Sequence, residues 1–305
     1  MLEQFVLAIV FGLVVGLFSG LLGIGGGTLM VPVFRLGFGM SAIASTATSL
    51  FTIVPTSIAG CITHLKNGTC IAKIGLAAGI AGALTSPLGV LAATNSPDIA
   101  IMACAALIIV YSAVTMFKKA LNMPKRSRSD LSTHATLQRF RAEFADEELT
   151  CEQIEEERVR QEAALAEQKK QLREEQKRVT AKMCVIGAAI GLVAGFASGY
   201  VGVGGGFIMV PLFISLLSIT MKQASGTSLV AVVLLAIPGV ITQCMHGNVD
   251  YIAGIAMAIG SIPGALFGAS LIRYIPERKL RFLFGFFLLF AAIILISNEL
   301  GVFAG

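Results

Sequence analysis

The chain has 305 residues, of which 55% are hydrophobic and only 13% are charged, and its mean hydropathy is +0.82. Soluble globular domains are about 45–50% apolar and about 25% charged, so this composition excludes a soluble fold with a polar surface all round. Between Lys118 and Lys182 lie 15 of the 23 Lys and Arg residues and 13 of the 18 Asp and Glu residues. The sequence therefore indicates an all-α polytopic membrane protein with one polar insert. The net charge of +5 does not indicate nucleic acid as a partner.

Five apolar segments follow one another before the insert, over residues 5–21, 28–36, 42–63, 71–93 and 99–117. A full membrane span takes about 20 apolar residues. The second segment is short, and it follows directly on the glycine run of SGLLGIGGGTLMVP, residues 19–32. This segment either crosses the membrane as a short span or turns back as a re-entrant half-helix.

The insert runs from about residue 121 to 182 and is rich in Glu, Lys, Arg and Gln. From about Leu137 it contains no Gly or Pro, which predicts a long helix. The heptad positions that start at Leu137 and Phe140 are only about half apolar, too few for a coiled coil. Two interpretations stay open: a solvated helical linker, or a regulatory helix through which copies of the chain associate as a homo-oligomer.

After the insert the chain repeats itself. Shifted by 179 residues, the glycine run matches SGYVGVGGGFIMVP at 198–211, and STATSL at 45–50 falls on ASGTSL at 224–229. The register holds without a gap for more than 70 positions, so the sequence is internally duplicated. Five apolar segments recur over 184–200, 207–219, 224–245, 251–272 and 282–296. The predicted organisation is a first transmembrane repeat at 1–120, the insert at 121–182 and a second transmembrane repeat at 183–305.

Basic residues at the segment ends predict the orientation. Lys and Arg are concentrated on both flanks of the insert, which places the insert in the cytoplasm by the positive-inside rule. If all five segments cross, the two repeats have opposite orientation, as in many secondary transporters, and only Arg35 lies on the wrong side. If the short segments re-enter, the repeats are parallel and Arg35 is no longer an exception. The charge pattern favours the inverted version.

The glycine run itself allows three interpretations. A phosphate-binding loop is excluded, because neither copy is followed by Lys-Ser or Lys-Thr and neither completes a G-x-G-x-x-G pattern. Helix packing explains the glycines spaced by four, which are Gly12, Gly16, Gly20, Gly191, Gly195 and Gly199. Three consecutive glycines instead predict a break in the helix, whose freed N–H groups and following helix N-terminus suit an anion. The break either contacts substrate or is purely structural.

Hydroxyl groups repeat with the glycines and complete the predicted site. Clustered Ser and Thr side chains can donate hydrogen bonds to an oxyanion, although in a span they often bond only to their own helix. The candidate substrate-binding residues are therefore Gly25, Gly26, Gly27, Thr48, Ser49, Gly204, Gly205, Gly206, Thr227 and Ser228. The apolar segments carry no carboxylate relay, and no metal-ligand cluster appears, so we expect no cofactor and no metal. His64 is interpreted as structural, with Gln243 opposite it in the repeat.

The duplicated motifs resemble the sulfite exporter TauE/SafE family of membrane permeases. The matching positions are Gly23, Gly25 to Gly27 and Pro32 in one half, Gly202, Gly204 to Gly206 and Pro211 in the other, and the Thr48-Ser49 and Thr227-Ser228 pairs. The resemblance covers both apolar halves and implies transport of small sulfur-containing anions such as sulfite, thiosulfate or organosulfonates. The insert departs from the family, whose members commonly join the halves by a short loop.

The sequence thus predicts a non-enzymatic secondary transporter of the inner membrane, with a small anion and membrane lipid as partners. The anion would bind between the halves and be exposed alternately on each side. One alternative is a membrane scaffold or sensor that works through the insert. Another is an intramembrane enzyme, but the spans offer no pair of nucleophile and base.

Overall fold

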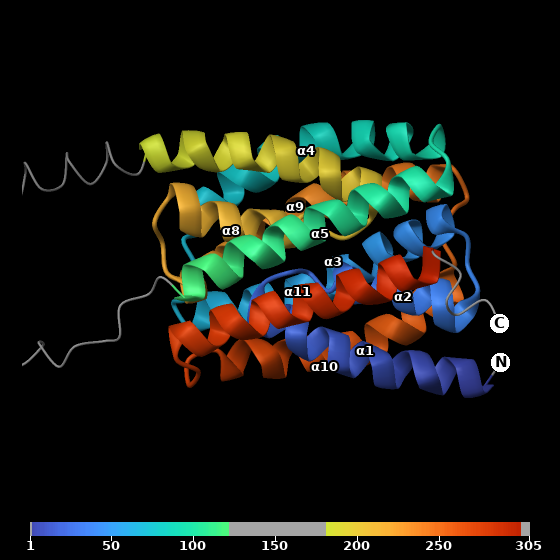
Figure 1. Cartoon of the computed structure of the whole chain (residues 1–305), viewed down its shortest axis with the longest axis horizontal. Helices are drawn as coiled ribbons and strands as arrows, with labels where there is room; N and C mark the ends of the chain where they lie inside the picture. Colours follow the sequence, from blue (N-terminus) through green and yellow to red (C-terminus); the bar gives the residue numbers. More distant parts are fainter. Residues whose placement is uncertain (1, 122–180, 300–305) are drawn as a thin grey trace, which may run out of the picture. The chain divides into compact units, whose positions relative to one another are not determined.

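The structure, a computed structural model, describes residues 2–121 and 181–299 (Figure 1). All of the secondary structure within these ranges is helical, and every predicted apolar segment forms a helix. The helices are α1 (Leu2–Leu22), α2 (Gly27–Phe38), α3 (Ala42–Lys66), α4 (Ala72–Thr94), α5 (Asp98–Leu121), an unlabelled helix Ala181–Val201, α8 (Gly206–Leu216), α9 (Met221–Met245), α10 (Tyr251–Leu271) and α11 (Glu277–Glu299). The long helix predicted within the insert lies outside the described residues, and the domain boundaries stay a prediction.

Seven of the described helices are long and apolar enough to span a membrane: α1, α3, α4, α5, the Ala181–Val201 helix, α9 and α10. Their apolar side chains are exposed around the outside of the bundle, where a soluble protein would be polar. We call the end at which α1 begins and α11 ends the termini end, and the opposite end, at which α5 ends and Ala181 begins, the insert end (Figure 1).

The first two helices of each half form a hairpin. A Cβ atom added to Gly26 would lie 3.3 Å from Val15 and 3.4 Å from Ser19, so the chain has already turned back along α1 where α2 begins. At its far end α2 returns to the termini end, where Arg35 pairs with Asp98 at the start of α5 (Nη1–Oδ2 3.4 Å). In the second half, Gly205 lies against Ala194 and Ser198 in the same way.

The short helices therefore turn back, and the expectation that all five segments cross is wrong. Helices α3, α4 and α5 still run between the two ends, as do α9, α10 and α11 (Figure 1). Where corresponding helices touch, they are antiparallel: Gly60 meets Leu229 and Gly239 meets Leu50 in the α3–α9 pair. The arrangement is consistent with inverted repeats. Arg35 remains on the termini end, where Asp98 balances its charge.

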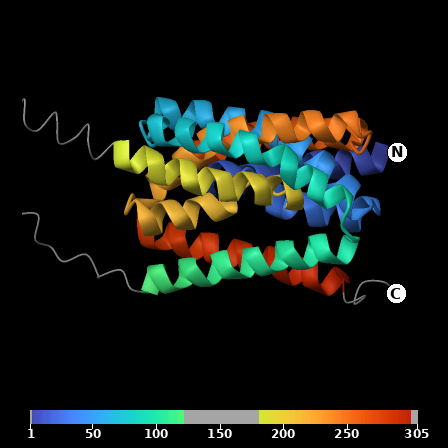
Figure 2. The same cartoon turned by 90° about the horizontal axis from the view of Figure 1, so that it is seen from above.

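The fourth helix of each half is exchanged between the halves. Helix α10 packs on α1 and α3, whereas α4 packs on α9 and on the Ala181–Val201 helix. Two four-helix groups result: the first bundle contains α1, α2, α3 and α10, and the second contains the Ala181–Val201 helix, α8, α9 and α4. Helices α5 and α11 lie side by side as a pair beside these bundles (Figure 2).

Small residues set the close contacts within each bundle, as the spacing of the glycines predicted. A Cβ atom on Gly12, Gly16 or Gly20 would meet the backbone carbonyl group of Met257, Ser261 or Ala265. The reverse holds for Gly260, Gly264 and Gly268, which face carbonyl groups of α1. Lipid tails provide no hydrophobic force between helices, so close backbone packing must hold them together.

We predict that Gly16→Ala lowers the stability of the folded protein, because the new methyl group forces α1 away from α10. The expected loss is about 1–3 kcal/mol, the usual cost of overpacking. The matched control is Gly37→Ala, since Gly37 is an exposed helical position with nothing within 4 Å of the added Cβ. Thermal unfolding of the two purified variants in detergent should separate them, and equal midpoints would contradict the packing role.

Candidate functional site

The two glycine runs form tight loops at residues 23–26 and 202–205, which we call the glycine loops. Their backbone φ angles are positive at Gly23, Gly25 and Gly26 (74°, 81° and 87°) and at the matching Gly202, Gly204 and Gly205 (74°, 84° and 67°). Residues with a Cβ rarely adopt this conformation. The three glycines with positive φ angles in each loop are therefore required by the turn that reverses the chain between each pair of helices.

The glycine loops touch each other in the interior. A Cβ atom on Gly27 would lie 2.6 Å from the backbone of Val203, and one on Gly206 would lie 2.8 Å from the carbonyl oxygen of Ile24. Every residue of both loops is buried. Helix α2 runs from this point towards the termini end and α8 towards the insert end, so their N-termini meet between the two bundles (Figure 1).

Backbone donors collect where the two N-termini meet. Among the described residues, the N–H groups of Gly25, Gly26, Gly204 and Gly205 have no hydrogen-bond partner. Both helices are capped by a glycine without a side-chain hydrogen bond, and neither has an acidic residue in its first turn. The positive ends of two helix dipoles are thus left uncompensated, an arrangement that favours a bound anion.

The four predicted hydroxyl residues have different surroundings. The hydroxyl oxygen of Thr48 accepts a hydrogen bond from the N–H of Asp250 (3.0 Å), and that of Thr227 accepts one from the N–H of Ile71 (2.9 Å). These backbone groups lie at the starts of α10 and α4, so each threonine caps a helix of the opposite half. Ser228 donates to the carbonyl oxygen of Gly23 (2.6 Å). The hydroxyl of Ser49 is buried and has no partner in the described structure.

Four further hydroxyl groups near the loops are also buried without a described partner: those of Ser19, Thr28, Ser57 and Ser198. Their residues are at most 1% exposed. Ser19 and Ser198 lie beside Gly26 and Gly205, and the Ser57 oxygen is 3.4 Å from the position of a Cβ on Gly25. Sequence reasoning missed these four as site residues. Ser19 and Ser198 could have been found because they repeat within the glycine motif, whereas Ser57 falls on Ala236 and carries no such signal.

The region around the loops has no fixed charge. The buried polar side chains of the described chain belong to Ser, Thr, one Gln and His64. His64 is held by the carbonyl oxygen of Gly20 (Nε2–O 2.8 Å) and by Thr69 (Nδ1–Oγ1 2.8 Å), so it ties the end of α1 to the end of α3. No group of three His, Cys, Asp or Glu that could hold a metal ion occurs in the described part of the chain.

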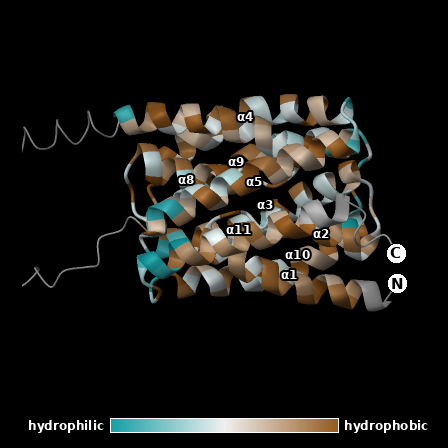
Figure 3. Ribbon diagram, viewed as in Figure 1, coloured by the Kyte–Doolittle hydropathy of each residue, from teal (hydrophilic) through white to brown (hydrophobic). Residues whose placement is uncertain are grey.

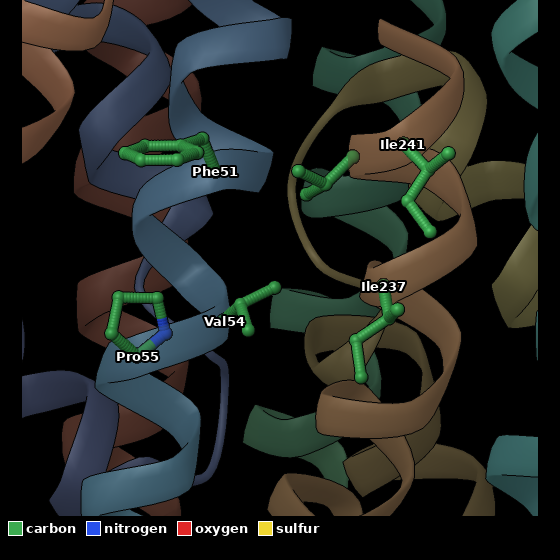
Figure 4. A pocket seen from close by; sticks show the side chains of 6 residues that line it. Phe51, Val54, Pro55, Ile237 and Ile241 are labelled. Atoms are coloured by element: carbon green, nitrogen blue, oxygen red, sulfur yellow. The ribbon is translucent and has the colours of Figure 1, made fainter. Parts of the chain in front are cut away.

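A separate apolar cleft of about 220 Å³ lies between α3 and α9. It is lined by Phe51, Val54, Pro55, Ile237, Val240 and Ile241 (Figure 4). Ile237 and Ile241 are 41% and 56% exposed, so the cleft opens on the outside of the bundle. The cleft is unsuited to an anion because every lining residue is apolar.

Comparison with known proteins agrees with this architecture. The family model of the sulfite exporter TauE/SafE matches residues 8–295. The chain belongs to this family. The probable membrane transporter protein YunE of Bacillus subtilis (strain 168) is 25% identical over 88% of this chain and 87% of its own. YdhB of the same organism, also a probable membrane transporter protein, is 22% identical over 87% of this chain and 89% of its own. No solved structure matches the chain significantly.

We predict that Thr48→Val destabilises this TauE/SafE-family protein while Thr48→Ser does not. Valine keeps the shape but leaves the N–H of Asp250 without its acceptor, at a cost of about 1–3 kcal/mol. Thr115→Val is the matched control, because the Thr115 hydroxyl is exposed and bonds only back to its own helix. Unfolding midpoints in detergent test this. A Thr48→Val midpoint equal to that of Thr115→Val would show that the cap is dispensable.

Proposed function

We propose that the protein is a secondary transporter that moves a small sulfur-containing anion, of the sulfite, thiosulfate or organosulfonate type, across the inner membrane. The observation that carries the proposal is the contact between the two glycine loops, whose unpaired N–H groups lie close to buried hydroxyls that have no partner in the described structure. Family membership supports transport as the role. The choice of sulfur anions rests on the family description and on the oxyanion chemistry of the donors.

The binding mode follows from the donors. Unpaired backbone N–H groups and hydroxyls such as those of Ser19, Ser49 and Ser57 are neutral, and each can donate one hydrogen bond to an oxyanion oxygen. Two helix N-termini add favourable electrostatics without a permanent counter-charge. Affinity is therefore modest and the anion can leave again, as a carrier requires. Thr48, Thr227 and Ser228 act mainly by holding the helices and loop that surround the anion.

Alternating access would move the two four-helix bundles, and these do not coincide with the two sequence halves. The α3–α9 contact between the bundles is uneven along its length. Towards the insert end a Cβ on Gly60 would lie 2.9 Å from Leu229, whereas towards the termini end a Cβ on Gly239 would lie 3.8 Å from Leu50 and the apolar cleft opens beside Val54 and Ile237. Rocking about this contact would close the cleft and loosen the insert end, which exposes the loops to the other side.

The proposed orientation places the insert in the cytoplasm. Outside the insert and its immediate flanks the chain has eight basic residues, and seven of them lie in the loops and helix ends at the insert end: Lys66, Lys73, Lys222, Arg273, Arg278, Lys279 and Arg281. The eighth, Arg35, is paired with Asp98. This asymmetry supports a cytoplasmic insert end.

A scaffold or sensor that works through the insert is the alternative. Deleting residues 129–180 separates the two, because the described bundle contains every residue proposed for binding. We predict that the deleted protein still transports the anion in proteoliposomes. Loss of transport from a deletion variant that inserts and folds like the wild type would favour a working role for the insert.

We further predict that Gly26→Val combined with Gly205→Val abolishes anion flux, because branched side chains would fill the loops and distort their backbone. The control pair is Gly39→Val with Gly68→Val, since these glycines also have positive φ angles (63° and 65°) but nothing within 4 Å of the added Cβ. The assay is uptake of sulfite, thiosulfate, sulfoacetate and sulfate into proteoliposomes, with and without a proton gradient. Wild-type flux in the first double variant would disprove the central site.

A further inference from the structure

The insert end of the bundle carries a second cluster of donors, away from the glycine loops. Figure 3 shows hydrophilic residues gathered where α5 ends and α11 begins. Phe117 of α5 contacts Phe282 of α11, with ring centroids 6.1 Å apart, so the end of α5 packs against the start of α11. Lys119 also donates a hydrogen bond to the Ser215 hydroxyl near the end of α8. Three helices thus meet around two cations.

In this cluster one carboxylate, that of Glu277, faces two cations, those of Lys119 and Arg281. Glu277 accepts a hydrogen bond from Arg281 (Oε1–Nη2 2.6 Å) and another from the N–H of Met221 (3.1 Å). Lys119 lies near enough to Arg281 to be repelled by it. The Nε atom of Arg281 is buried and has no partner among the described residues, although the side chain is 12% exposed. A buried guanidinium N–H without an acceptor leaves room for an anionic one.

The positive-inside rule explains the other basic residues of this end but not this pair. Lys222 donates to the carbonyl oxygen of Arg273 (2.9 Å), and Arg278 lies over the ring of Phe282. Both are accounted for by those contacts and by their position in the loops. Lys119 and Arg281 are instead both partly buried and near enough to repel each other, which is costly unless an anion joins them.

The matching positions of the first half do not form such a cluster. At the termini end, the positions that correspond to Ser215 and Arg281 are Leu36 and Met102, which cannot bind an anion, although the carboxylate of Glu277 has its counterpart in Asp98. At the opposite end, α2 is instead joined to α5 by the Arg35–Asp98 ion pair. Ser215 lies nine positions after Gly206 along α8, a rise of roughly 14 Å at 1.5 Å per residue.

We propose that Lys119 and Arg281 form a second anion site at the mouth of the transporter, on the insert end. Its ligand is an oxyanion group, held by the Lys119 ammonium and the free Nε–H of Arg281. The Ser215 hydroxyl accepts a hydrogen bond from Lys119 and donates its own proton to the carbonyl oxygen of Pro211, so it positions the lysine. The group belongs either to the free anion on its way to or from the glycine loops or to the phosphate of a membrane lipid. The identity of the free anion rests on the proposed function, whereas the site itself does not.

The test measures binding of sulfate and thiosulfate to the full chain in phosphatidylcholine nanodiscs by calorimetry. We expect Lys119→Gln to weaken one binding event roughly tenfold or more, since a charge-assisted contact is lost. The exposed neighbour Lys118→Gln is the matched control and should bind like the wild type. The glycine double variant, Gly26→Val with Gly205→Val, removes the central event instead, so failure of either site is recognised separately.

A second arm distinguishes the two sources of the ligand. Native mass spectrometry measures whether phosphatidylglycerol stays bound to the wild type and is lost from Lys119→Gln and Arg281→Gln. Such a loss with unchanged sulfate binding supports the site with a lipid phosphate as its ligand. If Lys119→Gln, which leaves the Arg281–Glu277 pair intact, binds both probes as the wild type does, the proposal is overturned.

Discussion

The rest of this structure depends on where unwound backbone can be placed inside a membrane. Each glycine loop frees N–H groups that hydrocarbon cannot satisfy, so it must be covered by protein or face a polar cavity. Here each loop is covered by the other: Gly27 lies against Val203, and Gly206 against Ile24. One loop without its partner would expose polar backbone to an apolar interior. The two copies of the motif are therefore a single structural unit.

The same constraint explains why the fourth helices are exchanged. At the start of α10, the backbone N–H of Asp250 donates a hydrogen bond to Thr48 of the first half. At the start of α4, the backbone N–H of Ile71 donates one to Thr227 of the second half. Ser228 of α9 likewise holds the carbonyl oxygen of Gly23. Neither half completes its own hydrogen bonds. Rocking of the sequence halves as rigid bodies would break these contacts, whereas movement of the two four-helix bundles keeps most of them.

Much of this could be predicted from the sequence because duplication is a strong signal. The ten helices of the described residues, the packing role of Gly16 and its neighbours and the helix breaks all follow from patterns that occur twice. The return of α2 and α8 could not be predicted, because a short apolar segment has the same composition whether it crosses or turns back. The partners of Thr48 and Thr227 could not be predicted for another reason: they lie 202 and 156 residues away in the sequence, and only the exchange of helices brings them close.

The contacts that differ between the two repeats bear most directly on function. Asp98 accepts a hydrogen bond from the N–H of Ala42, the first residue of α3 (3.2 Å). Glu277 accepts one in the same way from the N–H of Met221, the first residue of α9 (3.1 Å). Their arginine partners, however, come from different elements. Arg35 belongs to α2, so its ion pair ties the first hairpin to α5 at the termini end.

Arg281 lies on the same helix as Glu277 and ties no hairpin. At the insert end α8 is instead joined to α5 by the hydrogen bond from Lys119 to Ser215, and the proposed mouth anion would also contact Lys119. In the proposed alternating access, opening the termini end would break an ion pair, whereas opening the insert end would involve a lysine that the proposed mouth anion would also bind. A perfectly symmetric carrier has two end states of equal energy. Under the proposed mechanism, these unequal contacts would give the two states different energies and would make the balance between them depend on the mouth anion.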